Sequence, residues 1–121
     1  MRVVDASVLL AFAKGEEGAG QAEVLLQEGA SCGAANWSEV AQKVRAAGRD
    51  WHLVRALLAS YDLTVEAVTA QDAEWAAARW RRGEELSLAD RLCLALGERL
   101  DADVWTADTN WGSTGRVHQL R

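Results

Sequence analysis

Strand-forming and helix-forming segments alternate along the chain, and this alternation restricts the possible folds more than any other feature. A β-branched run at residues 2–4 stops at Asp5, and residues 6–18 then repeat apolar positions at helical spacing before ending in glycine. Further strand-like segments lie at 31–35, 63–68, 103–108 and 116–120, and further helical segments at 21–30, 36–48, 50–61, 69–83 and 87–100. Strands separated by helices need crossover connections, so the sequence predicts a parallel sheet with helices on both faces, an α/β/α sandwich.

The length and the apolar content of the chain fit one domain. The chain has 121 residues, of which 50% are hydrophobic, so a single domain over residues 1–121 with its own core is expected. The longest apolar run, 8–13, is far shorter than the roughly 20 residues that cross a bilayer, and no signal-like segment begins the chain. We therefore expect no membrane contact and a cytoplasmic location. Cys32 and Cys93 lack metal-like spacing, which favours two buried reduced thiols over a structural disulfide.

The charge balance limits the ways in which the chain can meet a nucleic acid. A net charge of −5 argues against a general nucleic-acid binder, which usually holds phosphates with an excess of Lys and Arg. It does not exclude a nucleic-acid enzyme whose acids are concentrated in one metal site. Basic residues do form two local groups, which are either solvated helix faces or sites for phosphate or an acidic partner: Lys43, Arg45, Arg49 and Arg55, and then Arg79, Arg81 and Arg82.

Four acids occupy matching places in the predicted fold. Asp5 and Asp108 each follow a strand, while Glu39 and Asp90 lie in the first turns of helices. In a parallel sheet these places face the crevice beyond the carboxyl ends of the strands, so we expect the four side chains to converge. Each acid alone also fits a helix cap, since Asp5 can cap the next helix, and the pairs Asn36–Glu39 and Ser87–Asp90 have capping-box spacing.

Converging carboxylates need a cation. Two like charges 4 Å apart repel by about 4 kcal/mol at an effective dielectric constant near 20. Oxygen ligands without histidine or thiolate favour Mg²⁺ or Mn²⁺ over zinc. A metal ion held in this way can activate water for attack on a phosphodiester, so hydrolysis of RNA or DNA becomes possible.

The acidic motifs also resemble a known family. In order and spacing, "VVDASVLLAF", "NWSEV", "LSLADRLCLALG" and "VWTADTNW" resemble the motifs of PIN-domain ribonucleases, in particular the VapC-type toxins of bacterial toxin–antitoxin pairs. The resemblance runs from Arg2 to about Leu120. It implies that the catalytic acids are Asp5, Glu39, Asp90 and Asp108, with Asp5, Asp90 and Asp108 as metal ligands.

The resemblance implies further properties of the site and its partners. Ser7 and Thr106 match hydroxyl positions that support the acids, although each hydroxyl can equally satisfy the backbone at a helix start or strand end. Asn110 matches a position that is often polar, and it also suits a turn. A family member would cleave structured or translation-related RNA to leave a 3′-hydroxyl and a 5′-phosphate. It would bind a cognate antitoxin over the acidic groove and form a homodimer.

Three functional hypotheses follow. The first is a Mg²⁺- or Mn²⁺-dependent endoribonuclease toxin, and the second is a catalytically weak PIN-like binding module that acts through RNA or antitoxin contacts. The third is a phosphohydrolase with Asp5 as covalent nucleophile; it ranks last because that class usually carries a second acid where this chain has Ser7. Trp37 and Trp111 lie close to motif acids, where core packing and stacking on an RNA base are both open interpretations.

Overall fold

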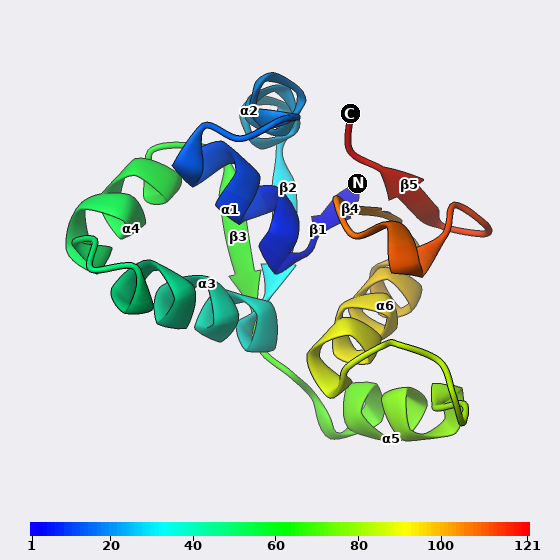
Figure 1. Cartoon of the computed structure of the whole chain (residues 1–121). Helices are drawn as coiled ribbons and strands as arrows, with labels where there is room; N and C mark the ends of the chain where they lie inside the picture. The colour runs from blue at the N-terminus through cyan, green and yellow to red at the C-terminus, as the bar shows by residue number, and fades with distance from the viewer.

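The computed structural model describes residues 1–121 and contains one five-stranded parallel sheet with six α-helices. The strands are β1 (Arg2–Val4), β2 (Ala30–Gly33), β3 (Leu63–Glu66), β4 (Asp103–Thr106) and β5 (Val117–Gln119). Their order across the sheet is β3-β2-β1-β4-β5, and every neighbouring pair is parallel (Figure 1). The predicted parallel α/β/α fold is confirmed.

Helices cover the two faces of this sheet. The helices are α1 (Ala6–Lys14), α2 (Ala19–Glu28), α3 (Ala34–Ala46), α4 (Trp51–Ala59), α5 (Ala70–Arg79) and α6 (Leu88–Leu100). Neighbouring residues of β1 point to opposite faces, as strand geometry requires. Val4 joins a core cluster formed with α1 to α4, while Val3 joins a second cluster with α6, β4 and β5. The central strand is therefore buried on both sides, and α5 packs on the outside of α6.

Several helix ends differ from the predicted ones. The helix predicted for residues 6–18 ends at Lys14, where Gly15 caps it, and the helix predicted for 21–30 spans Ala19–Glu28 because Ala30 already belongs to β2. The helix predicted for residues 69–83 ends at Arg79, and Trp80 already has extended backbone angles. Trp80 is 52% exposed, so packing against the core does not favour continuing the helix past Arg79. After the helix ends, the guanidinium of Arg79 forms a bidentate ion pair with Glu84 across the turn. The helix α3 begins at Ala34, two residues before the predicted start, because Gly33 ends β2 and serves as the N-terminal cap.

One close approach fixes α6 against the sheet. A Cβ atom at Gly97 would overlap Cγ2 of Val104, so the helix can lie this close to β4 only without a side chain at that position. This contact sets the position of α6, whose N-terminal turn carries Asp90. None of the helices is long and apolar enough to span a membrane.

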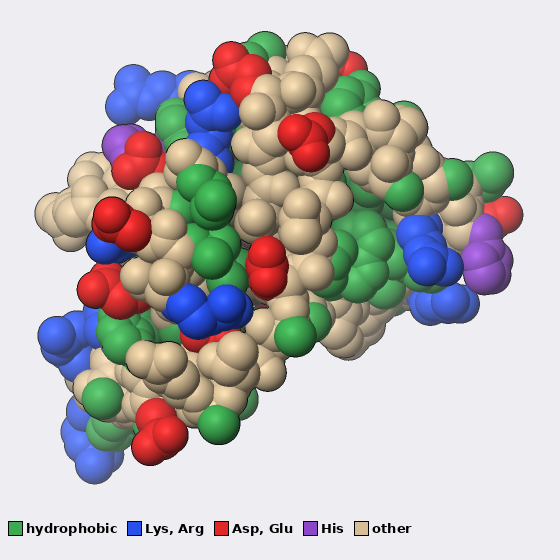
Figure 2. Space-filling view, turned by 180° about the vertical axis from the view of Figure 1, so that it is seen from behind, with side chains coloured by type: hydrophobic (Ala, Val, Ile, Leu, Met, Phe, Trp, Pro, Cys, Tyr) green, Lys and Arg blue, Asp and Glu red, His purple; other side chains and the backbone are tan.

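Hydrophobic side chains remain exposed on part of the surface. Figure 2 shows the molecule from behind, with hydrophobic side chains gathered toward the edge where α4 lies. Leu53 and Leu57 of α4 are 70% and 44% exposed, one helical turn apart, and Val65 on the edge strand β3 is 42% exposed. Such side chains are available for contact with another protein.

Candidate functional site

Asp5 follows β1 directly and caps α1, and its buried carboxylate accepts three hydrogen bonds. Ser7 Oγ donates to Oδ1 at 2.6 Å, and the Val8 backbone N–H donates to the same oxygen at 3.1 Å. Thr106 Oγ1 at the end of β4 donates to Oδ2 at 2.6 Å. The capping interpretation of Asp5 is confirmed, but a cap alone does not require two further hydroxyl donors.

The protons of both hydroxyls are directed to Asp5 by the backbone. Ser7 Oγ accepts the Ala107 N–H at 2.8 Å, and Thr106 Oγ1 accepts the Asp108 N–H at 3.0 Å. Because each hydroxyl has one proton and this proton points to Asp5, the arrangement favours the ionised carboxylate. The two hydroxyls thus bind the first acid and backbone N–H groups at the same time, and they connect the end of β4 to the start of α1.

Burial opposes this ionisation. Asp5 is only 4% exposed, and removal from water raises its pKa from 3.8 to about 6, against the lowering effect of the donors from Ser7, Thr106 and Val8. The negative charge of Asp90 raises the pKa of Asp5 further. A cation near Asp5 would act in the opposite direction.

The other three acids each keep one carboxylate oxygen without a hydrogen bond. In Asp90, Oδ2 accepts the Ser87 N–H at 2.9 Å in a complete capping box. In Asp108, Oδ1 accepts the Asn110 N–H at 2.9 Å. In Glu39, Oε1 accepts Nδ2 of Asn36 at 3.1 Å. The remaining oxygens, Oδ1 of Asp90, Oδ2 of Asp108 and Oε2 of Glu39, are free to bind a ligand.

Asn36 does not cap α3, so the capping-box interpretation of Asn36 and Glu39 is wrong. Asn36 lies inside the first turn and is 1% exposed. Its Nδ2 donates to Glu39 and also contacts the backbone oxygen of Ala89 in α6 at 3.4 Å. This amide joins α3 to α6 and orients Glu39 relative to the helix that carries Asp90. Sequence reasoning assigned the residue to a cap because only the packing of α3 against α6 distinguishes the two roles.

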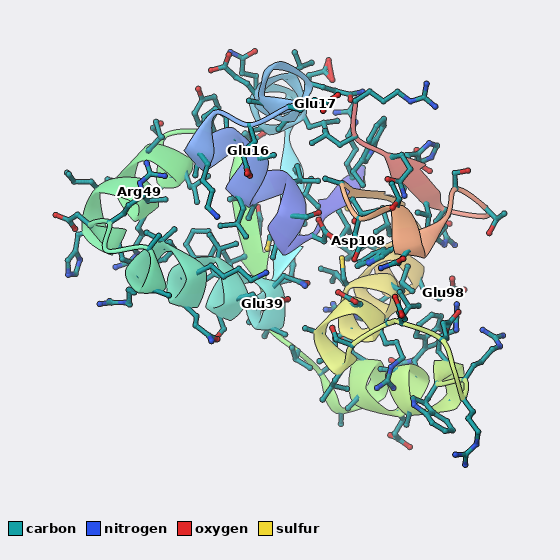
Figure 3. All side chains as sticks on the ribbon, in the orientation of Figure 1. Glu16, Glu17, Glu39, Arg49, Glu98 and Asp108 are labelled. Carbon is teal, nitrogen blue, oxygen red and sulfur yellow. The ribbon has the colours of Figure 1, made fainter.

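All four acids line one cavity of about 210 Å³ at the carboxyl edge of the sheet. Figure 3 labels Glu39, in the second turn of α3, and Asp108, between β4 and the next short helix, on the two sides of the start of α1. We call this space the acid cavity, and its lining residues are Asp5, Ala6, Ser7, Glu39, Lys43, Ser87, Asp90 and Asp108. Residues from four separated segments thus meet at the predicted crevice.

Comparison with known proteins identifies the family. A family model described as the PIN domain matches residues 2–117. The chain belongs to the PIN domain family. No curated protein matches the chain.

Solved structures with this PIN fold include a toxin–antitoxin complex from Klebsiella pneumoniae, with a TM-score of 0.81, 20% identity and coverage of 100% of this chain and 98% of that chain. A second is VapC20 from Mycobacterium tuberculosis, described as a sarcin–ricin loop cleaving toxin, with a TM-score of 0.76, 20% identity and 95% coverage of both chains. A third is VapBC2 from Rickettsia felis bound to a DNA fragment of its promoter, with a TM-score of 0.73, 11% identity and coverage of 99% and 98%.

The acid cavity of this PIN domain fits a hard divalent metal ion in the chemistry of its donors. It offers carboxylate and hydroxyl oxygens, and no sulfur or imidazole lines it. The arrangement is not a ready-made metal cage, since no three Asp, Glu, His or Cys side chains are grouped to hold an ion. Mg²⁺ usually keeps several waters and takes only one or two carboxylates, so the free oxygens of Asp90 and Asp108 beside Asp5 are compatible with it.

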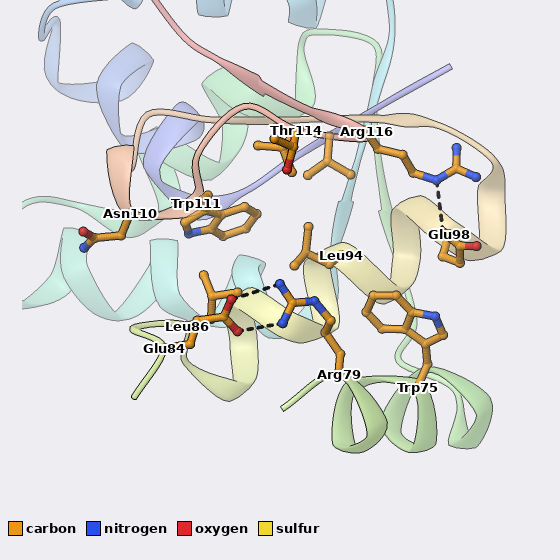
Figure 4. Close-up of a pocket in the computed structure, with 12 residues that line it drawn as sticks. Trp75, Arg79, Glu84, Leu86, Leu94, Glu98, Asn110, Trp111, Thr114 and Arg116 are labelled. Carbon is orange, nitrogen blue, oxygen red and sulfur yellow. Dashed lines mark hydrogen bonds and ion pairs between the residues drawn. The ribbon is translucent and has the colours of Figure 1, made fainter. Parts of the chain in front are cut away.

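Asn110 does not belong to the acid cavity of the PIN domain. Its backbone N–H orients Asp108, while the residue lines a second cavity of about 230 Å³ between α5, α6 and β5 (Figure 4). Trp75 and Trp111 form walls of this second cavity, and two ion pairs, Arg79–Glu84 and Arg116–Glu98, lie along it. The turn interpretation of Asn110 is thus the one that its contacts support.

The remaining aromatic residues and thiols have structural contacts. Trp37 packs edge-on against Trp51 at 5.2 Å between ring centroids, and Trp111 is 8% exposed in the core cluster under β4, so packing explains both. Cys32 and Cys93 are free and buried, as predicted, and burial raises the pKa of Cys32 to about 12. These thiols therefore stay protonated and unreactive.

Proposed function

We propose that this PIN domain is a Mg²⁺- or Mn²⁺-dependent endoribonuclease and the toxin of a toxin–antitoxin pair. The observation that carries the proposal is that Asp5, Glu39, Asp90 and Asp108 line one cavity at the carboxyl edge of the sheet. The solved relatives support it, since one is part of a toxin–antitoxin complex and another cleaves the sarcin–ricin loop. The substrate would be a structured or translation-related RNA in the cytoplasm.

The reaction is hydrolysis of a phosphodiester bond. An oxygen of water forms a bond to phosphorus, the bond from phosphorus to the 3′ oxygen breaks, and that oxygen takes up a proton, which leaves a 3′-hydroxyl and a 5′-phosphate. Asp5, Asp90 and Asp108 would hold a divalent ion, which supplies positive charge against the charge growing on the phosphoryl oxygens. The free Oε2 of Glu39 would accept the proton of the attacking water.

The supporting residues act through these acids. Ser7 and Thr106 keep Asp5 ionised by directing both hydroxyl protons to it, so that it retains a negative charge in a buried place. Asn36 leaves one oxygen of Glu39 free and holds the other, which fixes the direction of the free oxygen. These residues therefore position the acids.

Two protein partners belong to the proposal. A cognate antitoxin would cover the acid cavity, whose four carboxylates favour a basic side chain as the inserted group. A second copy of the chain would cover exposed apolar side chains, and the exposed Leu53 and Leu57 of α4 support a homodimer through that helix.

A second candidate function is a catalytically weak binding module that acts through RNA or antitoxin contacts. The absence of a grouped set of three metal ligands favours this alternative. A covalent phosphohydrolase is disfavoured because Asp5 is buried and both of its oxygens accept hydrogen bonds from neighbours, which makes the carboxylate a poor nucleophile.

A cleavage assay decides between the nuclease and the binding module. Purified protein is incubated with an end-labelled RNA stem–loop in Mg²⁺, in Mn²⁺ or in EDTA. We expect cleavage only with metal, and a loss on the order of 100-fold or more in Asp90→Asn. The control is Asp62→Asn, which removes the same charge beside the start of β2 at the opposite edge of the sheet and should cleave like wild type. Metal-independent cleavage, or full activity of Asp90→Asn, would contradict the nuclease proposal.

A further inference from the structure

Lys43 is the one basic residue among those that line the acid cavity. It follows Glu39 by four residues on α3, so both side chains lie on the same side of the helix. One helical turn separates them, a rise of about 6 Å along the axis. The cavity is therefore bordered by a cation next to the acid that would accept the proton of the attacking water.

The ammonium group of Lys43 makes no ion pair or hydrogen bond within the folded chain. Lys43 is exposed, it takes part in no ion pair, and its ammonium group donates to no acceptor in the protein. Several other cations are engaged with carboxylates or backbone oxygens, namely Arg2, Arg49, Arg79, Arg91, Arg99 and Arg116. The ammonium of Lys43 is thus available to a ligand that enters the cavity.

The negative charge of the protein and of the cavity is a reason to expect that Lys43 contacts the RNA. With a net charge of −5 and four carboxylates around the cavity, an approaching RNA phosphate meets repulsion at the place where it must bind. A bound metal ion would neutralise part of the carboxylate charge at the scissile phosphate, but not the repulsion on the neighbouring phosphates. A lysine on a flexible stem can reach such a neighbour as a compact positive charge.

We infer that Lys43 binds a backbone phosphate of the RNA adjacent to the scissile phosphodiester. The inference rests on the proposed ribonuclease function, and it assigns to Lys43 a substrate contact. Arg45 is not given this role: it lies two residues farther along α3 and is also exposed, but it does not line the cavity.

Binding of a fluorescent 12-nucleotide single-stranded RNA tests this role. Affinity is measured by anisotropy over a series of salt concentrations, in full-length protein that carries Asp90→Asn so that the RNA stays intact. Lys43→Gln and Arg45→Gln, each added to that background, remove the same charge from the same helix, so they form a matched pair. Lys43→Arg, which keeps the charge, is the third variant. Thermal unfolding of each variant checks the fold.

We expect Lys43→Gln to weaken binding about tenfold at low salt and Arg45→Gln to weaken it less than about twofold. The slope of log affinity against log salt should fall in magnitude by about 0.7 for Lys43→Gln, the value for one phosphate contact with a single strand. Lys43→Arg should bind within about twofold of the Asp90→Asn background.

Equal effects of Lys43→Gln and Arg45→Gln, an unchanged salt slope, or no RNA binding by the Asp90→Asn protein would overturn the inference. Failure of the proposed function has a different signature, because it appears as absence of metal-dependent cleavage by wild type in the separate assay. The binding comparison does not depend on cleavage.

Discussion

Replacing Asp5 by Asn should change the pH dependence of stability in metal-free protein, because Asp5 is a buried acid whose ionisation is opposed by the fold. Burial raises the pKa of Asp5 from 3.8 to about 6, although Ser7, Thr106 and Val8 donate hydrogen bonds to it. Between these two values the native protein holds a proton on Asp5 that the unfolded chain has already lost. The contribution of Asp5 to the free energy of unfolding is therefore fully present below pH 3.8 and decreases as the pH rises through about 6.

The size of the effect follows from the two pKa values of Asp5. The difference between 3.8 and about 6, at about 1.36 kcal/mol for each tenfold change in proton affinity, amounts to about 3 kcal/mol. Because Asp5 is 4% exposed, screening by solvent does not reduce this figure much. An Asn side chain does not titrate, so any hydrogen bonds that it loses shift its stability by the same amount at every pH.

Urea unfolding in EDTA between about pH 4 and pH 7.5 measures this contribution as the difference between Asp5→Asn and wild type. Other acids with shifted pKa values, such as Asp72 and Glu84, titrate equally in both proteins and cancel. We expect the free energy of unfolding of Asp5→Asn to rise relative to wild type by about 2.5 kcal/mol over this range, since a small part of the effect is already lost at pH 4. Asp62→Asn, which replaces an exposed acid at the opposite edge of the sheet, is measured in parallel as a control for the loss of one carboxylate. A difference for Asp5→Asn that stays constant within about 0.5 kcal/mol would refute the reasoning.

Three other perturbations have defined outcomes. Millimolar Mg²⁺ or Mn²⁺ should raise the melting temperature of wild type by several degrees at neutral pH in a thermal-shift assay, and a melting temperature that does not change with metal would count against a metal site in the acid cavity. Asn36→Ala should lower the kcat of cleavage more than it changes KM, because Glu39 loses its orienting partner, and should cost about 1–3 kcal/mol of unfolding free energy; wild-type kinetics would remove Asn36 from the site. Gly97→Ala should destabilise the fold by about 1–3 kcal/mol through overlap with Val104, whereas Gly20→Ala, in a helix with open space around it, should stabilise it by about 0.5–1 kcal/mol; equal effects in chemical denaturation would show that α6 does not need this close contact.

The sequence alone was sufficient to predict the order of strands and helices and the placement of the acids at the carboxyl edge of the sheet. Strand and helix periodicity are local signals, and the cap at Ser87 depends only on residues three positions apart, so the structure reproduces the predicted capping box of Ser87 and Asp90. Asp5 and Asp108 follow parallel strands, and carboxyl ends of parallel strands necessarily lie on the same edge.

The tertiary structure alone decided what each of these side chains touches. Thr106 reaches Asp5 across 101 positions of the sequence, and Asn36 contacts Ala89 across 53, distances over which no periodic pattern carries information. In the sequence Lys43 is only one member of a basic group, and the same packing places it at the acid cavity. These contacts depend on how α3 and α6 pack against a sheet that is buried on both faces. The depth and angle of that packing depend on side-chain volumes from the whole core, which no local pattern encodes.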